Sequence, residues 1–207
     1  MTSDIDTDPI QQVIQAFADG ELVVLLDHPS REGEADLILA AEFATGEKLN
    51  ILATVARGLI ALAITGQRLG ELGIPMIQPV NCAENWPHFA EPVDYTVGTT
   101  TGASAFDLAA TARAFTDPEA RPEHFARPGH LLPLREDAGG MTGRAGHTEG
   151  AVGLARLAGL CPAAVICEIM APDGTMASGE ALKTIISENN FPATTVQQIA
   201  EASAQLL

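Results

Sequence analysis

Two short, continuously apolar runs stand near the N-terminus, ELVVLL at residues 21–26 and DLILAAEF at residues 36–43. Apolar runs of this length are typical of strands that are covered on both faces of a sheet. The residues between them are charged, and an extended chain would place Glu32, Glu34 and Asp36 on one face. Such a cluster can bind a divalent cation or supply an acid and a base. A solvated acidic hairpin is the alternative interpretation.

The rest of the chain alternates between predicted strands and helices. Further apolar runs predict strands at residues 59–65 and 163–170. Helical spacing and turn residues predict helices near residues 8–20, 47–56, 104–115 and 148–160 and two more in the C-terminal tail, with Asp8 capping the first. The proline-rich segments 74–98 and 117–134 are predicted to be loops. No internal repeat or linker interrupts this order, so we expect one α/β (α+β) domain over residues 1–207.

The charge of the chain limits its partners. Its net charge is -16, with only 11 Lys and Arg residues, so it is expected to bind neither nucleic acid nor an anionic membrane. A small anionic ligand remains possible where basic residues gather. No apolar stretch reaches the ~18 residues of a membrane span. The first ten residues carry neither a basic region nor an apolar run, and the cysteines are scattered, so we expect a cytoplasmic protein.

A glycine-dense segment, GGMTGRAGHTEG at residues 139–150, precedes a predicted helix. Its five glycines allow the backbone to approach a ligand closely. Arg144 offers a planar donor group suited to phosphate, and Thr148 stands where the helix should begin, with His147 between them. A phosphate site is one interpretation, and a flexible turn with a surface arginine is the other.

Two further polar residues stand in unusual settings. Glu168 interrupts the apolar run in ICEIMAPDGTMA (residues 166–177), and a carboxylate there needs a partner or a proton. His130 follows a proline–glycine corner in RPGH. Taken alone, each has an ordinary explanation, because an edge-facing glutamate and an exposed or structural histidine are both common.

The motifs together resemble one family, the 3,4-dihydroxy-2-butanone 4-phosphate synthases of riboflavin biosynthesis. The resemblance rests on DHPSREGEAD, TTGASAFD, RPGHLLPLR, RAGHTEG and CEIMAPDGTMA, which follow in family order from about residue 10 to residue 200. It implies a mixed β-sheet flanked by helices, and a homodimer with its active sites at the subunit interface. The implied reaction converts D-ribulose 5-phosphate to L-3,4-dihydroxy-2-butanone 4-phosphate and formate, with Mg²⁺ or Mn²⁺ as the cofactor.

The resemblance also implies a role for each matching residue. Glu32 and His147 would bind the metal, and His130 and Glu168 would be essential for catalysis. The residues implied to contact the sugar phosphate are Arg31, Glu32, Asp36, Arg144, His147, Thr148 and Glu168.

The chain departs from the family pattern near the acidic loop. The departures are His28, Pro29, Ser30, Gly33, Ala35 and Leu108. They remove none of the implied site residues, but they leave two alternatives to the synthase. One is a diverged enzyme that acts on another sugar phosphate by the same chemistry. The other is a catalytically silent binding or partner protein. The cysteine cluster of the GTP cyclohydrolase II domain fused to some relatives has no counterpart here, so we expect a monofunctional member.

Overall fold

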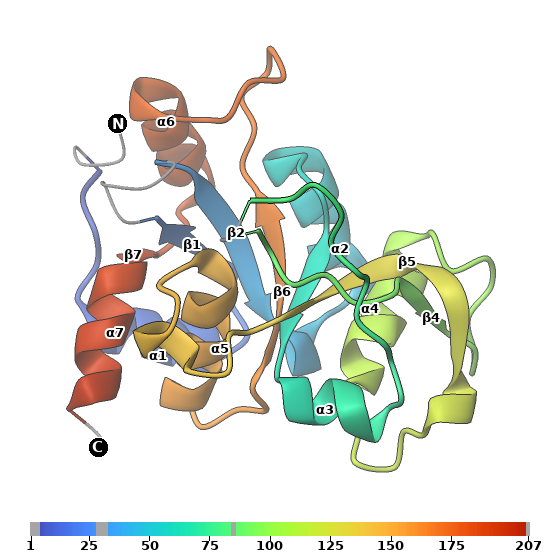
Figure 1. Cartoon of the computed structure of the whole chain (residues 1–207). Coiled ribbons are helices and arrows are strands. Elements are labelled where there is room, and N and C mark those ends of the chain that lie inside the picture. Colours follow the sequence, from blue (N-terminus) through green and yellow to red (C-terminus); the bar gives the residue numbers. More distant parts are fainter. Residues whose placement is uncertain (1–4, 28–32, 84–85, 206–207) are drawn as a thin grey trace.

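A seven-stranded mixed sheet forms the centre of the structure, a computed structural model that describes residues 5–27, 33–83 and 86–205 (Figure 1). The strands lie in the order β4-β5-β3-β6-β2-β1-β7. Their bounds are β1 Val23–Leu26, β2 Ala35–Ala40, β3 Ala61–Ile64, β4 Val93–Tyr95, β5 Phe125–Arg135, β6 Ala163–Glu168 and β7 Ala193–Thr195. The α-helices are α1 Ile10–Ala18, α2 Gly46–Ile51, α3 Gly66–Glu71, α4 Ala105–Ala114, α5 His147–Leu157, α6 Gly179–Asn189 and α7 Val196–Ala204.

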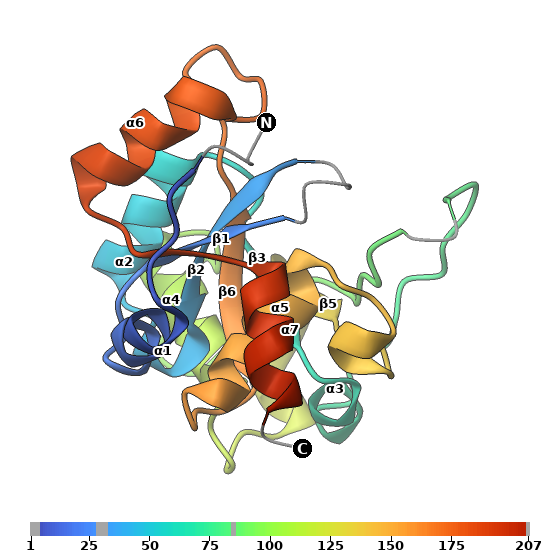
Figure 2. The same cartoon turned by 90° about the vertical axis from the view of Figure 1, so that its left-hand side faces the viewer.

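Helices cover both faces of this sheet (Figure 2). Apolar side chains of α1, α5 and α7 pack on one face, while those of α2, α3, α4 and α6 pack on the other. All residues of β1 and β2 are buried. Within β2, Leu37 belongs to one apolar cluster and Ile38 to the other, which explains why these strands read as continuous apolar runs. The α/β class with a mixed sheet flanked by helices is confirmed.

Most predicted elements are present, but one cap is wrong. The four apolar runs form β1, β2, β3 and β6, and the predicted helices appear within a few residues of their expected bounds. Ser104 caps α4, because its Oγ accepts a hydrogen bond from the N–H of Asp107 at 3.1 Å. Asp8 does not cap α1. The N-cap is Pro9, and an Asp8 carboxylate oxygen accepts instead from the N–H of Ala193 at 2.9 Å.

The prediction of a loop at residues 117–134 is wrong. Most of its second half belongs to β5, which runs parallel to β3 and antiparallel to β4. The β4–β5 register shifts between Val93 and Asp94. Pro128 lies opposite this irregularity, where the ladder does not need the N–H that proline lacks. A strand that contains prolines is therefore tolerated near the edge of the sheet.

Candidate active site

Asp36 on β2 and Glu168 on β6 stand opposite each other on neighbouring antiparallel strands. Directly opposed residues point to the same face of a sheet. Ile38 and Ile166, two residues further into the same strands, pack in the apolar cluster that contains α5. Both carboxylates therefore lie on the face that α5 covers, at the end of the sheet where their strands leave the apolar core.

Contacts with a neighbouring segment fix the Glu168 side chain. Its Oε2 accepts a hydrogen bond from the N–H of Leu59 at 2.8 Å, and its backbone carbonyl accepts from the N–H of Gly58 at 3.1 Å. A Cβ at position 58 would lie 2.6 Å from the same Oε2, so only glycine permits this close approach. The carboxylate is thereby held by the segment at Gly58 and Leu59, and it lines one cavity with Asp36. Because β6 lies between β3 and β2, the interpretation as an edge-facing glutamate is wrong.

The N-terminus of α5 lies next to these two carboxylates. His147 and Thr148 are its first residues, and His147 Nδ1 lies 3.8 Å from Asp36 Oδ1. Thr148 is buried. The free N–H groups and the dipole at a helix N-terminus favour an anion at this position. The start of α5 therefore suits a phosphate group, which is one of the two interpretations of the glycine-dense segment.

Glu149 holds Arg144 at the edge of this site. Arg144 Nη1 donates to Glu149 Oε2 at 2.8 Å, and the Glu149 side chain is buried. The same carboxylate also accepts from the N–H groups of Asp137 at 3.0 Å and Gly146 at 3.2 Å. Arg144 is thus held by a buried acceptor, and it is not a surface arginine on a flexible turn. Glu149 was not predicted from the sequence, although a glutamate three residues into a helix is the signal of a capping box.

A cavity of about 100 Å³ joins these side chains. Its lining contains five of the predicted site residues, which are Asp36, Arg144, His147, Thr148 and Glu168. Glu34 lines the same cavity, so two members of the predicted acidic face do lie together. Larger hollows of about 600 Å³ and 390 Å³ are lined by none of the predicted site residues.

Three buried polar atoms around this cavity lack a hydrogen-bond partner within the described part of the chain. They are Asp36 Oδ1, Arg144 Nε and His147 Nε2. A buried polar atom without a partner is costly, and in native proteins it calls for an explanation such as a ligand or an ion. The two partnerless nitrogens and the partnerless oxygen line a single cavity. They indicate a ligand that carries hydrogen-bond acceptors and is accompanied by a cation or a donor.

Burial raises the pKa of Asp36 from its ordinary value of 3.8 to about 6. Burial is the largest cause of this net shift; the charge of His147 lowers the pKa, and the charges of Glu168, Glu34 and Asp27 also contribute to raising it. The folded protein consequently binds a proton at Asp36 more tightly than the unfolded chain does. A cation at this cavity would offset the concentrated negative charge, as would a proton.

The pKa of Asp36 predicts how stability depends on pH. Because the pKa is higher in the folded protein, the carboxyl favours folding below pH 3.8 and loses that contribution as the pH rises to about 6. In metal-free protein we expect Asp36→Asn to raise the free energy of unfolding by roughly 1–3 kcal/mol at pH 8 and by about half as much at pH 5. Urea unfolding in the presence of a chelator measures both values.

The control for this prediction is Asp173→Asn, in a surface turn. Hydrogen bonds from Thr175 lower the pKa of Asp173, so this residue is ionised at both pH values. Its substitution should change stability equally at pH 5 and pH 8. An Asp36→Asn effect that is also equal at both values would contradict the raised pKa of Asp36.

The remaining predicted residues lie apart from the cavity or outside the described residues. Arg31 and Glu32 belong to the second group. His130 does not line the cavity, and its side chain is 51% exposed. His130 lies on β5 and Glu168 on β6, and β3 separates these two strands. Two strand spacings amount to roughly 10 Å.

The donor set is compatible with a divalent cation, although it is incomplete in the described residues. Among those residues, no group of three or more His, Cys, Asp or Glu side chains could hold a metal ion. His147 Nε2 is nevertheless buried without a hydrogen-bond partner there, and the carboxylates of Glu34 and Asp36 line the same cavity. One imidazole nitrogen together with hard carboxylate oxygens suits Mn²⁺. Mg²⁺ prefers oxygen ligands and fits such a site as long as nitrogen ligands are few.

Within the described ranges, no helix is long and apolar enough to cross a membrane.

Comparison with known proteins identifies relatives along almost the whole chain. The family model described as 3,4-dihydroxy-2-butanone 4-phosphate synthase matches residues 11–202. A protein of that name from Agrobacterium fabrum is 42% identical over 190 residues, covering 92% of this chain and 89% of the relative. The riboflavin biosynthesis protein RibBA of Aquifex aeolicus is 42% identical over 192 residues, which cover 92% of this chain and 47% of the relative. The chain thus spans about half the length of some of these relatives.

Solved structures resemble this fold closely. A 3,4-dihydroxy-2-butanone 4-phosphate synthase in complex with two magnesium ions superposes with a TM-score of 0.89 at 39% identity, covering 95% of this chain and 97% of that one. A two-domain synthase from A. baumannii gives a TM-score of 0.87 at 35% identity, covering 93% of this chain and 56% of that one.

Proposed function

Because this chain belongs to the 3,4-dihydroxy-2-butanone 4-phosphate synthase family, we propose that it converts D-ribulose 5-phosphate to L-3,4-dihydroxy-2-butanone 4-phosphate and formate in riboflavin biosynthesis. The observation that carries this proposal is the cavity shared by Asp36, Arg144, His147, Thr148 and Glu168. It combines a helix N-terminus that suits a phosphate with carboxylates that suit proton transfer. The products together contain all atoms of the substrate, so the reaction needs no other reactant.

The phosphate group is assigned to the start of α5. Thr148 and the first N–H groups of the helix offer neutral donors, and Arg144 adds a charged one. Arg144 Nη1 donates to Glu149 at 2.8 Å, and this hydrogen bond fixes the orientation of the guanidinium group. Arg144 Nε has no hydrogen-bond partner in the described residues. The site therefore binds the phosphate with donors that are already oriented before the substrate arrives.

The carboxylates and histidines are assigned to proton transfer. Loss of a proton beside the ketone of the sugar needs a base, and the later loss of water needs an acid. Asp36, with a pKa of about 6, can accept and return a proton near neutral pH. Glu168 is held beside it by Leu59, and His130 would act from the neighbouring part of the sheet. Several groups are required because successive steps move different protons.

A divalent cation, Mg²⁺ or Mn²⁺, would be held by His147 and Glu32. When bound, it supplies Lewis-acid stabilisation of negative charge that develops on substrate oxygens. The partnerless Nε2 of His147 supports this role, and Glu32 lies outside the described residues. The magnesium-bound relative of this fold also supports it.

We also propose a cytoplasmic homodimer with its active sites at the subunit interface. His130 is half exposed and lies outside the cavity lining, so a second subunit could complete its surroundings. The apolar side chains of Leu59 and Phe106 are likewise exposed, at 53% and 65%. The N–H of Leu59 donates to Glu168, so part of this exposed apolar surface adjoins a residue that we propose to be catalytic.

Formate release from ribulose 5-phosphate tests the proposed function directly. Purified protein should produce formate and the four-carbon phosphate in equal amounts, and only when Mg²⁺ or Mn²⁺ is present. A protein that binds the sugar phosphate and the metal without releasing formate would instead be the diverged enzyme or the silent partner. Assays with other pentulose and pentose phosphates then separate those two.

The phosphate assignment predicts a KM effect. Arg144→Ala removes a charged donor, so we expect the KM for ribulose 5-phosphate to rise about 10- to 100-fold while kcat changes much less. Steady-state kinetics measure both. Arg156→Ala is the matched control, because Arg156 pairs with Glu136 at 2.5 Å outside the cavity and its loss should leave KM unchanged. Wild-type KM and kcat in Arg144→Ala would refute the assignment.

A further inference from the structure

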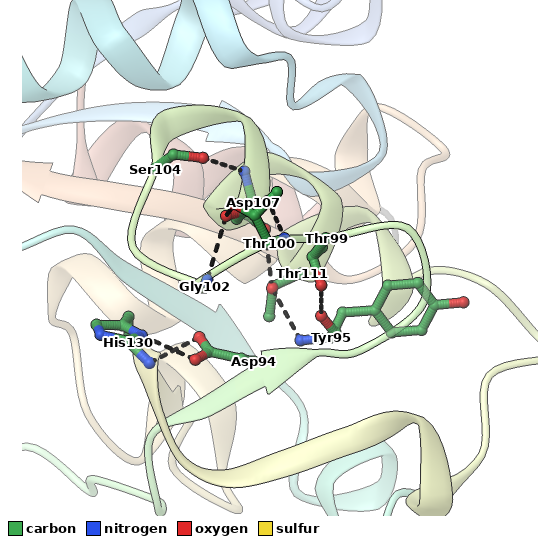
Figure 3. A network of polar contacts seen from close by, with 9 residues as sticks. All are labelled: Asp94, Tyr95, Thr99, Thr100, Gly102, Ser104, Asp107, Thr111 and His130. Atoms are coloured by element: carbon green, nitrogen blue, oxygen red, sulfur yellow. Dashed lines mark hydrogen bonds and ion pairs between the residues drawn. The ribbon is translucent and has the colours of Figure 1, made fainter.

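His130 and Asp94 form a pair that the sequence analysis did not identify (Figure 3). Asp94 lies on β4, next to β5, which carries His130. Asp94 Oδ1 accepts a hydrogen bond from the backbone N–H of His130 at 2.8 Å. Its Oδ2 lies 2.8 Å from the ring nitrogen Nδ1 of the same residue. One carboxylate therefore fixes both the backbone position and the ring rotation of His130.

The pair has a partly buried acceptor and an exposed ring. The Asp94 side chain is 15% exposed, whereas that of His130 is 51% exposed. A carboxylate can only accept hydrogen bonds, so the contact requires the proton to be on Nδ1. In neutral His130, Nε2 is then left with a free lone pair at the exposed edge of the ring. This is the form in which an imidazole can act as a base.

The loop between β4 and α4 braces Asp94 from behind. Gly102 has φ +86°, and a Cβ there would lie 2.1 Å from Asp94 Oδ2. The loop is held in turn by Asp107, which accepts from the N–H and Oγ of Thr100 at 3.0 and 2.7 Å and from the N–H of Gly102 at 3.1 Å (Figure 3). The two aspartates accept hydrogen bonds from different groups. Asp107 serves its own loop, whereas both oxygens of Asp94 serve His130.

We infer that Asp94 is a positioning residue that holds His130 in the Nδ1–H tautomer, with Nε2 free to accept a proton from the substrate. The inference rests on the proposed function, in which His130 is catalytic. It adds a residue that acts through His130 and has no contact of its own with the cavity. His130 on β5 and Glu168 on β6 lie on strands that β3 separates, so the orientation of the His130 ring decides whether the two groups can serve one substrate.

Asp94→Asn tests this role with little change in shape. The amide oxygen of asparagine can still accept from the backbone N–H of His130, but its NH₂ group would face Nδ1 and donate to it. The proton should therefore move to Nε2. We expect kcat for formate release to fall roughly 100-fold, in the range of a lost general base, with KM within about twofold of wild type. ¹⁵N-resolved NMR of the His130 ring reports the tautomer.

Three comparisons make the test decisive. Asp94→Glu keeps a carboxylate and should restore the Nδ1–H tautomer and part of kcat. Asp173→Asn, the same change in a distant surface turn, should alter neither. A wild-type His130 that carries its proton on Nε2, or an Asp94→Asn variant with the changed tautomer and wild-type kcat, would overturn the inference. If the wild type releases no formate, the proposed function fails. The NMR spectra of the wild type and of Asp94→Glu still show whether Asp94 sets the tautomer of His130 in that case. The same two spectra decide the question if Asp94→Asn does not fold.

Discussion

Replacing His147 by alanine should abolish metal-dependent formate release, with kcat/KM reduced by a factor on the order of 10³ or more. The expected size follows from the several kcal/mol of charge stabilisation that a bound cation supplies. His147 Nε2 is buried, lines the shared cavity and has no hydrogen-bond partner in the described residues. The proposed metal ion would give this nitrogen a partner. Titration of Mn²⁺ by calorimetry should show a matching loss of affinity.

The His147 substitution has a built-in structural check. The alanine variant should remain folded, because His147 stands at the helix start and its ring does not belong to either apolar cluster. His124→Ala is a suitable control, since the His124 ring accepts from the N–H of Arg121, packs edge-on against Tyr95 and does not line the cavity. That variant should keep both turnover and Mn²⁺ binding. A His147→Ala protein with unchanged metal dependence would refute the metal assignment, and Glu32→Gln tests the second expected ligand in the same assay.

The sequence was sufficient to predict the strands that are buried on both faces. β1, β2, β3 and β6 form the middle of the sheet with helices on both sides, so their apolar character is continuous and visible in the sequence. β5 was missed because Pro128 and Pro133 lie within it. β4 and β7 have three residues each, too few to show a periodicity. Near-edge strands are therefore the part of this fold that local patterns do not predict.

The composition of the site was predictable, but its geometry was not. The resemblance assigned roles to Asp36, His147 and Glu168. Only the pairing of β2 with β6 explains why Asp36 and Glu168 stand opposite each other. Strand pairing between segments so distant in the chain leaves no local signal in either segment. The same is true of the supporting acids. Glu149 and Asp94 act on Arg144 and His130 through contacts that only the folded chain makes.

Charge placement connects the acidic composition with the proposed chemistry. The chain has a net charge of -16, yet Arg144 stands at the positive end of α5. Glu149 neutralises only part of that guanidinium, through Nη1. Asp36 and Glu168 line the same cavity as Arg144. One small site therefore combines a positive helix end, which suits an anionic phosphate, with carboxylates that suit a divalent cation.

Replacing Glu168 by glutamine should reduce kcat by roughly 10²- to 10⁴-fold, the range expected for loss of a general acid or base. The protein should remain folded, because the amide oxygen can still accept the hydrogen bond from the N–H of Leu59 that now measures 2.8 Å. The substitution also removes one of the charges that raise the pKa of Asp36. We therefore expect the pKa of Asp36 to fall while turnover is lost, which ¹³C NMR of the carboxyl and the formate assay measure separately.

The outcome distinguishes a catalytic carboxylate from a structural one. If Glu168 only pins the segment at Gly58 and Leu59, glutamine should preserve activity and alanine should destroy it. If its charge is used in proton transfer, both substitutions should lose turnover, and only alanine should also lower stability. Glu136→Gln, which removes a carboxylate paired with Arg156 outside the cavity, should keep wild-type kcat. A Glu168→Gln enzyme with wild-type kcat would show that Glu168 has a structural role and takes no part in proton transfer.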